Sequence, residues 1–273
     1  MRYLFADWQR LKERIKRNRP FIFLDYDGTL TPIVETPQKA ILPEETKEIL
    51  IRLSRRPKCK LAIISGRALK DIKKLIGIKN IIYAGNHGFE LEGPKIKFKN
   101  SFAQKYQKLF RRIKEDLENK LSKIKDVFIE DKGYSLSLHY RLVKEEDIPL
   151  VKTIFHETII IPCVKGQLKI FMGKKVFEIR LPSDWDKGKA VLWLLARQQF
   201  GLKDNKVFPI YIGDDITDED AFKALRNKGL TVFVGNPKKS QANYYVKNTW
   251  EVKEFLEKIL ELYNTKYAKA NKG

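Results

Sequence analysis

The stretch from Phe21 to Thr31, which reads FIFLDYDGTLT, decides how this chain is interpreted. Its first four residues are apolar and predict a short buried strand. Asp25 and Asp27 follow directly, and the chain then turns at Gly28. Residues two apart in an extended segment point to the same face, so both carboxylates can converge on one small ligand. Two like charges at that separation need a cation, or one of them keeps a proton.

The same residues also suit an ordinary turn, because Asp and Gly are common after strands. A carboxylate pair in which one member is ionised and the other carries a proton instead suits phosphoryl transfer through an aspartyl intermediate. The residues at the other strand ends favour this chemical interpretation.

Length and composition indicate a globular protein with one large domain or two modest ones, since 43% of its 273 residues are hydrophobic. No apolar run reaches the about 18 to 20 residues that would cross a bilayer. Residues 1–19 mix apolar with many basic residues and lack the apolar centre of a secretory signal, so we expect an amphipathic surface helix. Cys59 and Cys163 are too few for a disulfide framework, which favours a reducing, cytoplasmic setting.

The formal net charge of +21 bears on the partners of the protein. Such a charge indicates nucleic-acid binding when Lys and Arg gather on one face. Here the basic residues are spread along the whole chain, so nucleic acid is the minor alternative. An anionic small molecule, steered by the positive field, is the preferred partner, and no membrane partner is expected.

The pattern of apolar runs predicts a parallel sheet. Five runs indicate buried strands, at residues 21–24, 61–64, 81–84, 208–212 and 230–234. Helical patterns lie at residues 43–54, 68–76, 187–200 and 218–226, with a final helix at 251–263. Strands that alternate with helices in this way form βαβ units, so the predicted class is α/β.

The middle of the chain has a different pattern. An amphipathic helix at 101–124 precedes a hairpin, and a second helix at 145–157 precedes another. The hairpins pair residues 127–130 with 134–140 and residues 168–172 with 175–181. We therefore assign residues 1–93 and 182–273 to the parallel-sheet domain and residues 94–181 to an inserted α+β domain, with hinges near 92–94 and 181–183.

Polar residues follow the second and third strands, at the edge of a parallel sheet where ligands bind. Ser65 and the backbone of Gly66 and Arg67 suit a phosphate oxygen. Ser65 could equally cap the helix that follows. Asn86 and His87 lie on a glycine-rich loop after the third strand, where they can bind a ligand hydroxyl, and a buried core histidine is the less favoured interpretation.

Acidic residues crowd the end of the fourth strand, over residues 213–220. Hard cations prefer carboxylate oxygens, and Asp214 is the candidate ligand. Asp218 and Glu219 could instead stabilise a helix N-terminus. Lys187 precedes a helix and could pair with Asp25 and a phosphate charge, although the alternative for any lysine in this chain is a surface position.

Five motifs in this order resemble the haloacid dehalogenase superfamily, and within it the trehalose-6-phosphate phosphatases. They are Asp-Tyr-Asp-Gly-Thr at 25–29, Ser-Gly-Arg at 65–67, Gly-Asn-His-Gly at 85–88, Trp-Asp-Lys-Gly at 185–188 and Gly-Asp-Asp-Ile-Thr-Asp-Glu-Asp at 213–220. The match spans residues 21–234. The resemblance implies a Rossmann-like parallel-sheet core with an inserted α+β cap domain.

The resemblance also implies roles in a Mg²⁺-dependent hydrolysis. Asp25 would take the phosphoryl group, and Asp27 would protonate the leaving sugar and then activate water. Ser65 and Lys187 would hold the transferring oxygens. Asp25, Asp214 and the backbone carbonyl of Asp27 would bind Mg²⁺.

In this family, residues of the cap grip the sugar, and the matching positions are Glu130, Lys132, Arg141 and Glu178. The implied activity is that of a phosphoric monoester hydrolase acting on trehalose 6-phosphate. A phosphatase of sucrose phosphate or mannosyl-3-phosphoglycerate, or a phosphomutase, would share the core motifs and stays open. A trehalose-phosphate synthase as partner is also left open.

Overall fold

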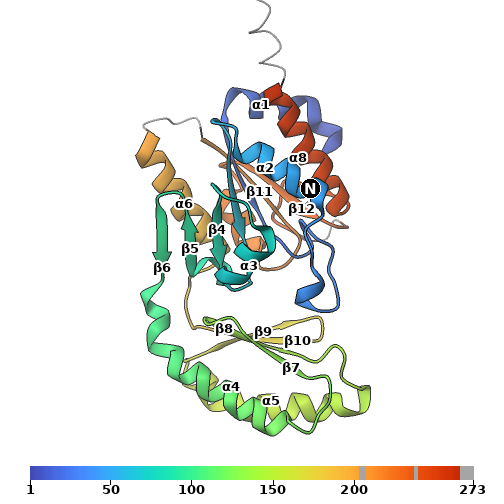
Figure 1. Cartoon of the computed structure of the whole chain (residues 1–273), viewed down its shortest axis with the longest axis vertical. Helices are drawn as coiled ribbons and strands as arrows, with labels where there is room; N and C mark the ends of the chain where they lie inside the picture. Colours follow the sequence, from blue (N-terminus) through green and yellow to red (C-terminus); the bar gives the residue numbers. More distant parts are fainter. Residues whose placement is uncertain (203–206, 237–238, 265–273) are drawn as a thin grey trace, which may run out of the picture. The chain divides into compact units, whose positions relative to one another are not determined.

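A computed structural model describes residues 1–202, 207–236 and 239–264 of the chain. Its contacts divide the chain into two compact units (Figure 1). The first, here called the core unit, comprises residues 1–98 and 185–273. The second, the insert unit, comprises residues 99–184. The assignment of residues 94–181 to a cap stays a prediction.

The core unit is built on a mainly parallel sheet, which has nine strands among the described residues. In spatial order they are β1 (Arg2–Tyr3), β13 (Tyr244–Val246), β12 (Leu230–Val234), β11 (Val207–Gly213), β2 (Arg19–Leu24), β3 (Lys60–Ile64), β4 (Ile82–Gly85), β5 (Glu90–Gly93) and β6 (Ile96–Lys99). Neighbours from β1 to β4 are parallel, and β5 returns antiparallel to β4.

All five predicted strands are present, and they form the centre of the sheet. The strands that the sequence did not indicate lie at its edges. β1 and β13 contain only two and three residues, too few for a recognisable pattern. β5 and β6 are only four residues long and alternate polar with apolar residues, and the predicted hinge at 92–94 falls where they connect.

Helices cover both faces of this sheet because its strands are buried on both sides. Ile22 and Leu24 of β2 pack in one apolar cluster with α1 (Trp8–Arg17), α2 (Glu44–Ser54), α3 (Leu69–Ile76) and α8 (Thr249–Asn264). Phe21 and Phe23 point to the other face and pack with α6 (Lys187–Leu202) and α7 (Glu219–Leu225). The predicted helix near the N-terminus is α1, and it buries Leu11 and Ile15.

The insert unit contains two helices and an antiparallel sheet of order β7-β8-β10-β9. Its strands are β7 (Phe128–Asp131), β8 (Ser135–His139), β9 (Lys169–Gly173) and β10 (Val176–Arg180), and its helices are α4 (Gln107–Leu121) and α5 (Ile148–Val164). Both predicted hairpins are present. α5 extends seven residues beyond its predicted end at 157 because its last turns expose Ile160, Ile161 and Val164, which hides the amphipathic pattern.

The predicted α/β class is confirmed, with a largely parallel sheet and a separate α+β region. No helix among the described residues combines the length and the apolar character that a bilayer-crossing segment requires.

Candidate active site

Asp25 and Asp27 lie in a loop directly after β2, the central strand between β11 and β3. The Asp25 backbone N–H donates to the carbonyl of Ile212 at 3.0 Å, so Asp25 continues the pairing of β2 with β11. The loop closes on itself through a 2.7 Å bond from the Gly28 N–H to the Thr31 carbonyl. The Asp25 side chain is thereby fixed at the carboxyl edge of the sheet.

Lys187, the first residue of α6, is buried and contacts two carboxylates. Its Nζ donates to Oδ1 of Asp25 and to Oδ1 of Asp218, both at 2.8 Å. Burial alone would lower the pKa of Lys187, but the charges of Asp218 and Asp25 raise it well above its usual range. The ammonium therefore stays charged and brings α6 to the end of β2.

Asp218 has no exposed surface and uses both of its oxygens in hydrogen bonds. Oδ1 also accepts a bond from the Tyr211 hydroxyl at 2.7 Å, and Oδ2 accepts the backbone N–H groups of Asp214 at 3.0 Å and Asp215 at 3.1 Å. Asp218 thus positions Lys187 and the acidic turn. No role was predicted for Tyr211. A tyrosine within an apolar strand was the feature that could have indicated one, because a buried hydroxyl needs a hydrogen-bond partner.

Three carboxylates crowd together, with oxygens of Asp25, Asp214 and Asp218 within 4.8 Å of one another. Burial raises the pKa of Asp25 well above its usual range, and Asp218 and Asp214 raise it further while Lys187 opposes them. Burial, with the charges of Asp218 and Asp215, raises the pKa of Asp214 to about 7. A divalent cation would stabilise the ionised carboxylates, and the cluster fits such a cation.

Asp27 is paired with Arg67. Nε of Arg67 donates to Oδ2 at 2.7 Å and Nη2 donates to Oδ1 at 2.5 Å, a bidentate geometry that fixes the carboxylate. The Arg67 guanidinium also lies 5.3 Å from the centre of the Tyr26 ring. The Asp27 side chain remains 42% exposed, so solvent and ligands can reach it.

The loops after β3 and β4 are hydrogen-bonded to each other. The N–H of His87 donates to the Ser65 carbonyl at 3.0 Å, and the N–H of Asn86 donates to the Arg67 carbonyl at 2.8 Å. Oγ of Ser65 accepts the N–H of Arg67 at 3.1 Å. α3 begins only at Leu69, so the interpretation of Ser65 as its helix cap is wrong.

His87 is buried, contrary to the expectation from its glycine-rich loop. Its ring lies against Gly66, where an added Cβ would be only 2.7 Å from the ring carbon Cε1. Asn86 and His87 both have positive φ angles, 53° and 56°, which non-glycine residues rarely adopt. The absence of a side chain at Gly66 thus allows the imidazole to cover the loop that follows β3.

In the insert unit, three of the predicted sugar-binding residues form a cluster. Nζ of Lys132 lies 3.7 Å from Oε2 of Glu130 and 3.5 Å from Oε1 of Glu178. Glu130 and Glu178 both pair with Ser137 of the intervening strand β8, so they share one face of the sheet.

Two further residues orient these glutamates, and the sequence analysis missed both. Nε2 of His139 lies 3.0 Å from Oε2 of Glu130, and Nε of Arg180 donates to Oε2 of Glu178 at 2.9 Å. Each lies in a strand at a position that alternates with apolar residues. This alternation was the one feature of the sequence that could have pointed to them. Arg141 instead donates to the Lys174 carbonyl at 3.3 Å.

The chain is similar to known phosphatases over most of its length. The model of the trehalose-phosphatase family matches residues 23–254. A trehalose 6-phosphate phosphatase of Zea mays is 37% identical, with 93% of this chain and 73% of that protein aligned. A probable trehalose-phosphate phosphatase D of Arabidopsis thaliana is 36% identical, with 93% and 70% aligned. The C-terminal domain of a C. albicans trehalose-6-phosphate phosphatase superposes with a TM-score of 0.76 at 26% identity, covering 93% of this chain and 96% of that one.

Substitution of Gly28 tests the geometry of the acidic cluster. A Cβ at Gly28 would lie 2.1 Å from Oδ2 of Asp214, so Gly28→Ala must displace that carboxylate. We expect divalent-cation affinity to fall at least about tenfold, which calorimetric titration with Mg²⁺ would measure. Gly77→Ala is the matched control, because Gly77 has a similar φ of +66° and no atom within 4 Å of the added Cβ. Equal affinities in the two variants would contradict the placement of Asp214.

The raised pKa of Asp214 gives a pH dependence with a definite sign. Between its ordinary pKa of 3.8 and about 7, the folded protein binds more protons than the unfolded chain. The contribution of Asp214 to the free energy of unfolding therefore falls as the pH rises through this range. A bound cation offsets that loss, so Mg²⁺ should raise Tm more at pH 8 than at pH 6.

Asp214→Asn should remove the pH dependence of the Mg²⁺ effect, because the amide keeps the shape without the charge. Differential scanning calorimetry on both proteins measures the shifts, with Asp71→Asn, an exposed position on α3, as the control. A Mg²⁺ shift in Asp214→Asn equal to that of the unmodified protein would show that Asp214 is not a ligand.

Proposed function

The chain belongs to the trehalose-phosphatase family, within the haloacid dehalogenase superfamily, and we propose that it hydrolyses trehalose 6-phosphate to trehalose and inorganic phosphate. The observation that carries this proposal is the buried contact of Lys187 with Asp25, beside the carboxylate of Asp214. A nucleophile, a fixed positive charge and a cation-binding carboxylate at one sheet edge suit the removal of a phosphoryl group.

The first chemical step uses Asp25 and Asp27. A carboxylate oxygen of Asp25 attacks phosphorus, and the bond from phosphorus to the sugar oxygen breaks. As a proton donor, Asp27 must release one of its two oxygens from Arg67 and carry a proton there. It gives this proton to the sugar oxygen, so trehalose leaves as the neutral alcohol. Lys187 holds Oδ1 of Asp25 and thereby orients the attacking carboxylate.

The second step regenerates the enzyme. Asp27, now ionised, takes a proton from a water molecule, and the water oxygen attacks the phosphorus of the phosphoaspartate. The bond from phosphorus to the Asp25 oxygen breaks, and inorganic phosphate is released. Arg67 supports this role because its two hydrogen bonds hold the Asp27 carboxylate in one orientation.

We assign Mg²⁺ as the cation, held by Asp25, Asp214 and the backbone carbonyl of Asp27. Mg²⁺ needs only one or two carboxylates besides water and phosphate oxygens, and when bound it neutralises charge on the phosphate. Thr29 supports the ligand role of Asp214, because its hydroxyl donates to Oδ1 of Asp214 at 3.1 Å and so orients the carboxylate. Ser65 and the backbone of Gly66 and Arg67 complete the proposed phosphate surroundings, and the loop of Asn86 and His87 is proposed to bind a hydroxyl of the ligand.

We propose that the insert unit is the cap and selects the sugar. Glu130, Lys132 and Glu178 present two acceptors and a donor on one sheet face, a set that suits the hydroxyl groups of a disaccharide. Polar groups of this kind reject ligands that lack a hydroxyl, because their partners are then left unpaired. The free thiols of Cys59 and Cys163 support our proposal of a cytoplasmic setting.

Replacement of the nucleophile is the direct test. Asp25→Asn keeps the size of the side chain and leaves Lys187 its bond to Asp218, so the protein should fold. We expect phosphate release from trehalose 6-phosphate with Mg²⁺ to fall by about 10³-fold or more. Circular dichroism and Tm serve as the fold control, and turnover near that of the unmodified enzyme would rule out the covalent mechanism.

Removal of the charge at Lys132 tests sugar selection. In Lys132→Met, kcat/KM for trehalose 6-phosphate should fall about 10-fold to 100-fold, while hydrolysis of p-nitrophenyl phosphate should change little. Lys144→Met is the matched control, because Lys144 is an exposed lysine of the same unit. Equal losses on both substrates would mean that Lys132 does not bind the sugar.

A further inference from the structure

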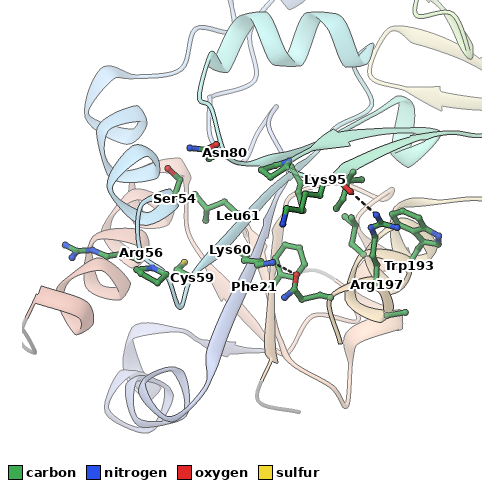
Figure 2. A pocket seen from close by; sticks show the side chains of 17 residues that line it. Phe21, Ser54, Arg56, Cys59, Lys60, Leu61, Asn80, Lys95, Trp193 and Arg197 are labelled. Atoms are coloured by element: carbon green, nitrogen blue, oxygen red, sulfur yellow. Dashed lines mark hydrogen bonds between the residues drawn. The ribbon is translucent and has the colours of Figure 1, made fainter. Parts of the chain in front are cut away.

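A cavity of about 890 Å³ opens at the edge of the core sheet opposite the candidate active site (Figure 2). The same elements contribute to both places with their opposite ends. Phe21 near the start of β2 lines the cavity, whereas Asp25 follows the end of that strand. Lys60 begins β3, whereas Ser65 follows its end. The cavity is therefore separate from the site that would bind the substrate phosphate.

The charge of the cavity has one sign. None of its lining residues in the described part of the chain is Asp or Glu, whereas four are basic: Arg56, Lys60, Lys95 and Arg197. Figure 2 shows Arg56 pointing away from the other three, with Lys60, Lys95 and Arg197 facing the same space. The described lining therefore offers an anion positive charges and no carboxylate that would repel it.

The basic side chains are held in place. Lys60 donates a hydrogen bond to the side chain of Gln198, and partial burial lowers the pKa of its ammonium. Nη2 of Arg197 donates to the Lys95 carbonyl at 2.8 Å. The Arg197 guanidinium lies 5.6 Å from the centre of the Trp193 ring. The Lys60 bond joins β3 to α6, and the Arg197 bond joins α6 to the β5–β6 connection.

The backbone at Lys95 is unusual for its residue type. Lys95 has a φ of 60°, a left-handed conformation that favours glycine or asparagine in a turn. A lysine there is strained relative to a glycine, because its Cβ crowds the backbone in this conformation. The observed side chain reaches the cavity (Figure 2), so the strained position places an ammonium where a glycine would leave none.

Most of the rest of the lining is apolar, with Ser54, Asn80 and Gln198 as its uncharged polar members. Phe21, Leu61, Ile82, Ile96, Trp193 and Leu194 contribute side chains. A volume of this size is typical of pockets that enclose a small organic molecule, and the partly exposed Trp193 ring suits a flat or apolar body. A pocket that combines apolar surface with fixed cations favours a ligand that has an anionic group and an apolar body.

We propose that this cavity binds an organic phosphate with an aromatic or apolar body, of about the size of a nucleoside monophosphate. The phosphate would lie between Lys60 and Lys95, and the body would contact Trp193. Neither inorganic phosphate nor an uncharged nucleoside satisfies both parts of the lining, so each should bind more weakly than the complete ligand.

Calorimetric titration with AMP and with 1-naphthyl phosphate tests this site, with EDTA present so that no turnover consumes the ligand. We expect at least one of these two probes to bind at least about tenfold more tightly than adenosine or inorganic phosphate. Lys60→Gln and Lys95→Gly should each weaken this binding about tenfold or more, while Mg²⁺-dependent hydrolysis of p-nitrophenyl phosphate stays unchanged. Lys95→Gly relieves the strained φ, so its Tm should stay equal or rise, which excludes misfolding as the cause.

The double variant Lys223→Gln with Lys228→Gln is the matched control, because it removes two exposed charges of the core unit outside the cavity. It should bind both probes as the unmodified protein does. The proposal is overturned if neither probe binds, if the cavity variants bind as well as the unmodified protein, or if the control loses as much affinity as they do.

Discussion

The ion pairs of the buried Lys187 ammonium are the constraint on which the rest of the core unit depends. A charge at this depth is stable only when it is paired, and Asp25 and Asp218 supply the partners. These three residues come from the end of β2, the start of α6 and the turn after β11, which lie far apart in the sequence. The chain leaves the core unit at residue 98 and returns at 185, two residues before this lysine.

The balance of charge around Lys187 explains why the site fits a cation. Asp25, Asp214 and Asp218 face one ammonium, and the pKa values of all three carboxyl groups are raised, chiefly by burial. Asp218 is satisfied by the Tyr211 hydroxyl, Lys187 and two backbone N–H groups. The remaining excess of negative charge lies on Asp25 and Asp214. Without a bound cation, this charge would repel the dianionic phosphate of a substrate.

The sequence predicted what depends on local pattern and missed what depends on distant contacts. Buried apolar runs identified the central strands, and the order of polar residues at their ends identified Asp25, Lys187 and Asp214. β1 and β13 were not predicted as strands because two or three residues show no periodicity. They are strands only because they pair with each other across the chain. The role of Asp218 in positioning Lys187 and the acidic turn was not predicted. Its side chain turns back to its own loop, and the spacing of acidic residues in the sequence does not reveal this.

The two ends of α6 illustrate how one scaffold separates two anion-binding environments. Lys187 in the first turn faces more carboxylates than cations, so the substrate phosphate needs a metal ion to approach. About 15 Å along the same helix, Arg197 lies beside a cavity that contains cations and no lining carboxylate, where an anion needs no metal. Dependence on a divalent cation therefore distinguishes binding at the carboxyl edge of the sheet from binding at its amino edge. The overall charge of +21 attracts anions to both, and only the local carboxylates decide which edge requires the metal.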